Sequence, residues 1–120
     1  MQMRLPESGS LIAAVLGGLG HAVADGEGIA VDQVGEAQLA EALAALSRGD
    51  IEYVILEAGD EFLQAAGEGD GPYALQFNPA GGDGLLEVPG GVDGAALRTA
   101  LLAYHRGDPA WRGALRWSAL

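Results

Sequence analysis

The sequence predicts a single α+β domain over residues 1–120, with an antiparallel β-meander of about four strands packed against two to three helices. Two stretches carry apolar residues at helical spacing. Between them lie short segments rich in alternating or β-branched residues. Glycine-rich turns separate these segments, and they are too short for crossover helices, so neighbouring strands should run antiparallel. A chain of 120 residues also has the usual size of one domain.

The apolar segment 11–20 admits two interpretations. As a helix it would be capped by Ser8 or Ser10, and its larger apolar residues share one side: Leu11, Ile12, Val15, Leu16 and Leu19. As a signal peptide it would end in the small-x-small site Ala22–Ala24. Arg4 is the only side-chain cation before it, which is a poor signal-peptide start, so we expect a retained helix in a cytoplasmic protein. The segment is also shorter than the roughly 20 apolar residues of a membrane span.

A short strand at Ile29–Val31 and a helix at Glu36–Arg48 should follow. The helix is indicated by leucines at i, i+4 and i+7, namely Leu39, Leu43 and Leu46. Gly49 is placed to end it as a left-handed cap.

Four strands are expected next, at residues 51–57, 61–66, 73–78 and 85–88. The first is apolar on both faces, which predicts a central strand. Because alanine supplies much of the apolar fraction, the core should depend on the few large residues, including five aromatic ones: Tyr53, Phe62, Tyr73, Phe77 and Tyr104. In the third strand, Tyr73, Leu75 and Phe77 should face the core together.

A third helix at 95–106 is predicted from the apolar stripe Leu97, Ala100, Leu101 and Tyr104, with Asp93 or Gly94 as its cap and Gly107 as its end. For the tail at 111–117 we expect a turn and then a short edge strand. Its tryptophans could cover one end of the core, with arginine planes stacked on their rings or paired to the acidic face. Alternatively the tail is an interaction surface, since Trp and Arg are enriched at binding hot spots.

The net charge of −11 is unevenly distributed, because residues 1–97 carry −14 and residues 98–120 carry +3. A negative field repels nucleic-acid phosphates and anionic membranes and speeds encounter with cations. The partner should therefore be a protein with a basic surface, with no nucleic acid and no membrane involved. The alternative explanation of the charge is solubility alone.

Few residues are available for catalysis. The chain has no cysteine and no lysine, which excludes thiol nucleophiles, zinc–thiolate sites, Schiff bases and the P-loop lysine. No serine lies in a G-x-S-x-G motif, and His105 is placed as a cation at the end of a helix. The carboxylates Glu57, Asp60 and Glu61 gather around a turn, as chance predicts for so acidic a chain. We expect no enzyme activity, no cofactor and no bound metal.

The order of elements over residues 51–117 resembles the Imm1-type immunity proteins, small bacterial α+β proteins that neutralise polymorphic toxins, often of the deaminase class. The resemblance consists of the strand meander at 51–88, the helix at 95–106, the helix-ending Arg106-Gly107-Asp108 and the terminal Leu115-Arg116-Trp117. It implies a protein that blocks the active site of a cognate toxin without chemistry of its own. Gly107 and Trp117 would then be structural residues.

Two functional hypotheses follow. The first is a non-enzymatic protein-binding domain, an immunity protein whose partner is a basic toxin domain. Its candidate partner-binding residues are Glu57, Glu61, Trp111, Arg112, Arg116 and Trp117. The second is a small-ligand-binding protein or enzyme, in which Glu57, Glu61, Gln64 and Gln76 line a pocket on the sheet. A meander also leaves strand edges that a homodimer would cover.

Overall fold

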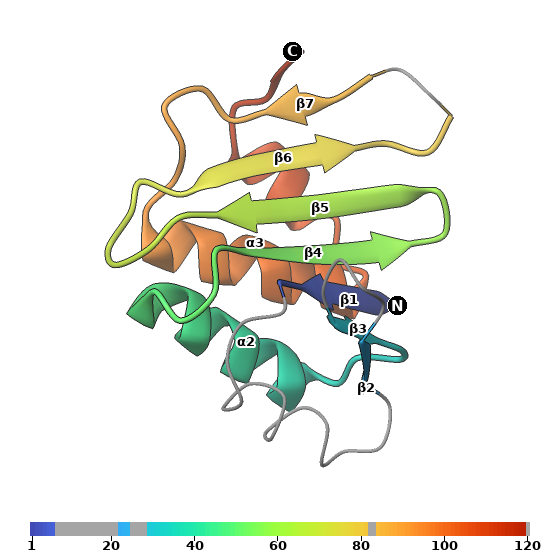
Figure 1. Cartoon of the computed structure of the whole chain (residues 1–120). Coiled ribbons are helices and arrows are strands. Elements are labelled where there is room, and N and C mark those ends of the chain that lie inside the picture. Colours follow the sequence, from blue (N-terminus) through green and yellow to red (C-terminus); the bar gives the residue numbers. More distant parts are fainter. Residues whose placement is uncertain (7–21, 25–28, 82–83, 120) are drawn as a thin grey trace.

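The computed structural model describes residues 1–6, 22–24, 29–81 and 84–119. In these ranges one antiparallel sheet carries three helices on one of its faces (Figure 1). The strands are β1 (Gln2–Leu5), β2 (Ala22–Ala24), β3 (Ile29–Val31), β4 (Tyr53–Ala58), β5 (Glu61–Ala66), β6 (Ala74–Asn78), β7 (Leu86–Glu87) and β8 (Ser118–Ala119). The helices are α2 (Glu36–Arg48), α3 (Gly94–Arg106) and α4 (Ala110–Ala114).

The predicted α+β class with an antiparallel sheet is confirmed, but the predicted number of about four strands is wrong. The strand order is β2-β3-β1-β4-β5-β6-β7-β8, and the expected meander corresponds to β4 to β7. The additional strands, β1, β2 and β8, are short; β1 and β8 pair with residues far along the chain, whereas β2 pairs with the neighbouring β3. Met3 of β1, for example, lies opposite Val31 on one side and Leu56 on the other. Such pairing leaves little local signal in the sequence.

Both predicted long helices are confirmed, together with their caps. Gly49 ends α2 with φ 81°, and Gly107 ends α3 with φ 76°, which is the left-handed conformation that glycine adopts without strain. The side chain of Asp93 accepts a hydrogen bond from the backbone N–H of Ala96 at the start of α3. The cap at Gly107 sets where α3 ends, and therefore where the tail begins.

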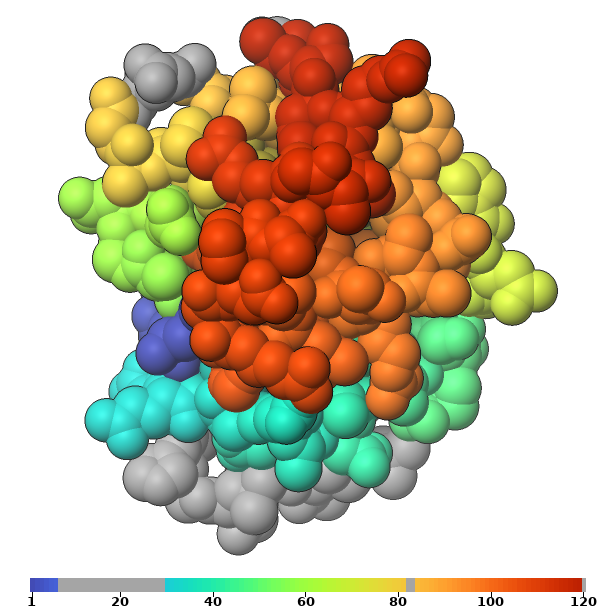
Figure 2. All heavy atoms as spheres, turned by 180° about the vertical axis from the view of Figure 1, so that it is seen from behind, coloured from blue at the N-terminus to red at the C-terminus, as the bar shows by residue number. Residues whose placement is uncertain are grey.

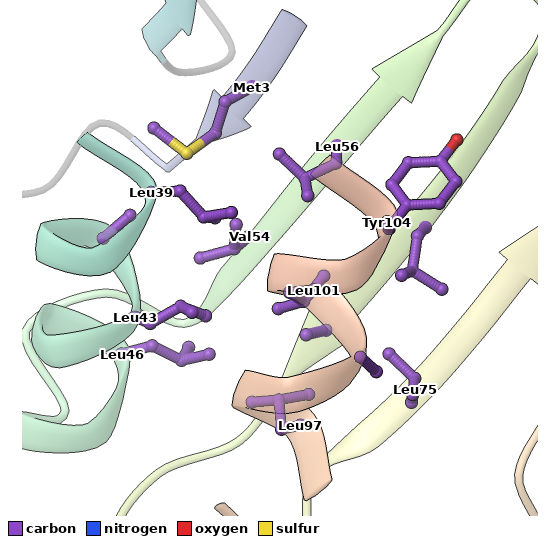
Figure 3. Packing of buried hydrophobic residues seen from close by; sticks show 14 of the residues in the cluster. Met3, Leu39, Leu43, Leu46, Val54, Leu56, Leu75, Leu97, Leu101 and Tyr104 are labelled. Atoms are coloured by element: carbon purple, nitrogen blue, oxygen red, sulfur yellow. The ribbon is translucent and has the colours of Figure 1, made fainter. Parts of the chain in front are cut away.

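The core lies between the helices and one face of the sheet, which we call the helix side (Figure 3). Tyr73, Leu75 and Phe77 are at most 2% exposed, so the inward face predicted for the strand at residues 73–78 is confirmed. The leucines of α2 and the apolar stripe of α3 are buried as predicted. Tyr53 and Phe62, however, were expected in the core and are only half-buried. Strand alternation points them to the opposite face, because Val54, Leu56 and Leu63 take the inward positions.

The tail differs from its prediction. A short helix, α4, replaces the expected turn, and the edge strand forms later, as β8, which pairs with β7. Pro109 stands at the start of α4, and Oδ1 of Asp108 accepts a hydrogen bond from the Ala110 N–H at 3.0 Å. A proline at this point favours a new helix because its φ is already helical.

The predicted helix at 11–20 lies outside the described residues. No helix in the described part of the chain is both long and apolar enough to cross a bilayer.

Candidate partner-binding surfaces

The sheet separates the predicted partner-binding residues into two groups. Glu61, Trp111 and Arg112 lie on the helix side. Glu57 points the other way, because alternate residues of β4 face opposite sides and Val54 and Leu56 are the buried ones. Glu57 and Glu61, which the sequence places around one turn, therefore lie on opposite faces of the sheet.

An aromatic cluster joins the tail to the core. The ring of Trp111 meets those of Phe77, Tyr104 and Trp117 edge to face, with centroid distances of 4.9, 5.4 and 5.7 Å. Trp111 is only 6% exposed, and Trp117 is half-buried. Each such aromatic pair adds about 0.5–1.5 kcal/mol beyond its buried area. The tryptophans thus have a packing role, while Arg116 lies exposed between α4 and β8.

The arginine stacking expected on the tryptophans takes a different form. The guanidinium carbon of Arg112 lies 4.9 Å from the centroid of the Phe77 ring, within the range of a cation–π contact. A tail arginine therefore packs on a core aromatic residue.

A pocket of about 330 Å³ opens beside the aromatic cluster, and we call it the tail pocket. Its lining includes two carboxylates, three aromatic rings and one cation: Glu61, Asp108, Phe77, Tyr104, Trp111 and Arg112. Figure 2 shows the helix side, where the blue N-terminal residues, the green β4–β5 hairpin and the red tail approach one another. Met1, Ala58 and the residues after α3 line the pocket from these three segments.

The carboxylate of Glu61 has an unusual environment in this pocket. The Tyr104 hydroxyl donates a hydrogen bond to its Oε1 at 3.0 Å. Burial, and then the hydrogen bond to Glu61 and its negative charge, raise the pKa of Tyr104, so the phenol stays a neutral donor. Neither Glu61 nor Asp108 forms an ion pair with a residue that the structure describes. The charge of the half-buried Glu61 is therefore uncompensated by any described cation.

The opposite surface of the sheet we call the open face, defined by the side chains that alternate with the buried ones. Its apolar centre consists of Tyr53 and Ile55 on β4 and Phe62 on β5, all half-buried. None of the described helices covers this face (Figure 1). Three neighbouring large apolar side chains thus remain partly exposed.

Polar side chains continue the open face around this centre. Gln64 and Gln76 stand directly opposite each other on β5 and β6, and Gln76 faces Glu87 in turn. Nε2 of Gln76 donates to Oε2 of Glu87 at 3.4 Å. Arg4 forms an ion pair with Glu57 on the same face.

These positions also bear on the small-ligand hypothesis. Gln64, Gln76 and Glu57 share the open face, whereas Glu61 lies in the tail pocket on the helix side. The four side chains do not converge on one pocket.

Sequence reasoning missed two features of these surfaces. It assigned Tyr53 and Phe62 to the core, and it gave Tyr104 and Asp108 no place in a site. Strand alternation could have shown that Phe62 faces away from the core, because Phe62 shares a face with the polar Gln64. The contact of Tyr104 with Glu61 joins residues 43 positions apart and has no local signal.

No protein-family model matches the chain, and searches of curated proteins and of solved structures find no match either. The two surfaces are therefore the observations from which a function can be inferred.

Proposed function

We propose that this chain is a non-enzymatic protein-binding domain that docks a basic protein on its open face. The observation that carries the proposal is the partly exposed apolar centre of Tyr53, Ile55 and Phe62, on a sheet face without a described helix. Amide and carboxylate side chains surround this centre, together with Arg4 in its ion pair with Glu57. An apolar centre with a polar rim is typical of protein–protein interfaces.

The charge of the chain favours a basic partner over a second copy of itself. At −11, two copies would repel each other at long range, whereas a cationic protein would be attracted. The attraction acts mainly on the rate of encounter, and the apolar centre supplies the contact that holds the complex.

The resemblance to Imm1-type immunity proteins supports a secreted bacterial toxin domain as the basic partner. Neutralisation of such a toxin requires occlusion of its active site and no chemistry from the binding protein. The protein would act in the cytoplasm, where the toxin has its target.

The proposal predicts a toxin gene beside this one, and it is tested with the product of that gene, by measuring binding between the purified proteins and growth protection in cells. Ile55→Arg places a cation at the centre of the open face and should weaken binding about a hundredfold, because it opposes the basic partner and interrupts the apolar contact. Protection of growth should be lost with it.

Thr99→Arg is the matched control, since it adds the same side chain at an exposed position on α3. It should change the affinity by less than about threefold. Equal weakening by both variants would show that the open face is not the interface. A wild-type chain that neither binds nor neutralises the toxin would refute the proposed function.

A further inference from the structure

The tail pocket offers a binding chemistry different from that of the open face. It lies on the helix side of the sheet, and its walls combine two carboxylates with aromatic rings. Its volume of about 330 Å³ falls at the lower end of the range of ligand pockets, about 300–1,000 Å³. This size suits one side chain better than a large organic ligand.

The charge in the pocket leaves room for a further cation. Among the side chains that line the pocket, Glu61 and Asp108 are negative and Arg112 is positive. Met1, whose α-amino group is a further cation, also lies in the lining. The guanidinium of Arg112 is engaged on the Phe77 ring, 4.9 Å from the centroid. The aromatic wall thus already carries one flat cation, and neither carboxylate is paired with a cation that the structure describes.

The orientation of Glu61 indicates how a cation would be held. Tyr104 binds only one of its oxygens, Oε1, and no described residue donates to Oε2. A half-buried carboxylate gains most from a charged donor, because water solvates it incompletely. The ring of Trp111, which is 6% exposed, lies in the same lining, and aromatic rings attract cations.

We propose that the tail pocket binds the guanidinium group of an arginine side chain. A guanidinium is planar, stacks on aromatic rings and pairs with a carboxylate through two parallel N–H donors. An ammonium group is a compact point charge without a plane to stack or a fork of donors. This arginine belongs to the basic partner protein. That assignment of the arginine to the partner rests on the proposed function, and the rest of the inference does not. The pocket chemistry stands independently of the open face.

Tryptophan fluorescence reports directly on this pocket. The sequence contains two tryptophans, Trp111 and Trp117, and both belong to the aromatic cluster. Titration with N-acetyl-arginine amide should give a saturable change in emission. N-acetyl-citrulline amide, a neutral molecule of nearly the same shape, should bind about tenfold more weakly because it lacks the charge. Equal binding of the two probes would overturn the proposal.

Glu61→Gln provides a second, independent test on the full chain. It keeps the shape of the side chain and should weaken binding of the arginine probe about tenfold. Asp60→Asn removes the same charge from the neighbouring position, which is exposed and does not line the pocket, and should change binding less than about twofold.

Equal loss in Glu61→Gln and Asp60→Asn, or no loss in Glu61→Gln, would overturn the proposal. Should Glu61→Gln fail to fold, the comparison of arginine and citrulline on the unchanged chain still decides. The proposed function is judged separately, by the effect of Ile55→Arg on the partner itself.

Discussion

Two adjacent glycines near Tyr73 differ in the space that each leaves for a side chain. Gly90 and Gly91 have nearly equal φ angles of 79° and 78°. A Cβ atom at Gly91 would lie 2.6 Å from the carbonyl oxygen of Tyr73, whereas one at Gly90 would meet nothing within 4 Å. Tyr73 and Val92 exchange two backbone hydrogen bonds of 2.7 and 2.9 Å beside this contact, so the two segments cannot separate freely.

We therefore expect Gly91→Ala to destabilise the protein far more than Gly90→Ala. Gly90→Ala should lower the free energy of unfolding by about 1 kcal/mol, through its positive φ alone. Gly91→Ala should lower it by about 3 kcal/mol, because a backbone clash is added to the same strain. Urea unfolding of the two variants and the wild type measures both values. Equal losses would show that the close approach to Tyr73 is unimportant.

For single residues, the alternation of side chains along a strand predicted some orientations correctly and failed for others. Over residues 73–78 one face is mostly polar and the other is apolar, so the burial of Tyr73, Leu75 and Phe77 followed directly. In β4 both faces are apolar, and the sequence did not show which face the helices cover. The prediction of Tyr53 as a core residue failed for this reason, whereas Phe62 lies on β5, where it shares the open face with Gln64. Both are now part of the centre of the candidate interface.

Among the elements, β1 should contribute most to stability for its length. Its four residues lie between β3 and β4, and Met3 and Leu5 have no exposed surface. Leu5→Ala should lower the free energy of unfolding by about 2–5 kcal/mol, the range for truncating a buried leucine. Thermal or urea unfolding measures the loss.

Arg4→Ala serves as the control on the same strand. Arg4 points to the open face and forms an ion pair with Glu57, with 41% of its side chain exposed. Its loss should cost less than about 1 kcal/mol, as for other exposed ion pairs. Similar costs for the two variants would contradict the central position of β1 in the core.

The strength of local signals explains which elements could be predicted. Helices α2 and α3 carry their periodicity, their caps and their ends within about fifteen residues, and their predicted bounds agree closely with the structure. The strands β1 and β8 have at most four residues each and are defined by partners far along the chain, and β2 has only three residues. For α4, five residues are too few to show a helical apolar pattern, and Pro109 at its start is the main local signal.

The candidate site was predictable to a similar extent. The composition of the tail identified Trp111 and Arg112, and the acidic turn identified Glu61, which the fold brings into one pocket. Tyr104 and Phe77 were recognised as core residues, but their part in the pocket depends on tertiary contacts between α3, the tail and the sheet. Composition can thus indicate which residues are available, and only the fold shows which of them meet.

At the scale of the whole molecule, the excess of acidic residues should lower stability at low salt. There are 17 acidic residues and 6 basic ones, and the ion pairs in the described part of the chain include Arg4–Glu57, Arg48–Asp50 and Arg106–Glu36. Each exposed pair contributes about 0–1 kcal/mol, so the unpaired carboxylates dominate the balance. At about 0.01 M salt the Debye length is about 30 Å. The molecule measures 37 × 31 × 24 Å, so most of its charges then repel one another.

Raising NaCl from about 0.01 M to about 0.1 M shortens the Debye length to about 10 Å and should raise the free energy of unfolding by about 1 kcal/mol. Urea unfolding at the two salt concentrations measures the change. Glu41→Gln, which removes one exposed carboxylate on α2, should stabilise the protein at low salt and lose this advantage at high salt. A decrease in stability with salt would mean that the three ion pairs outweigh the repulsion. The acidic field would then be too weak to select a basic partner over a second copy of the chain.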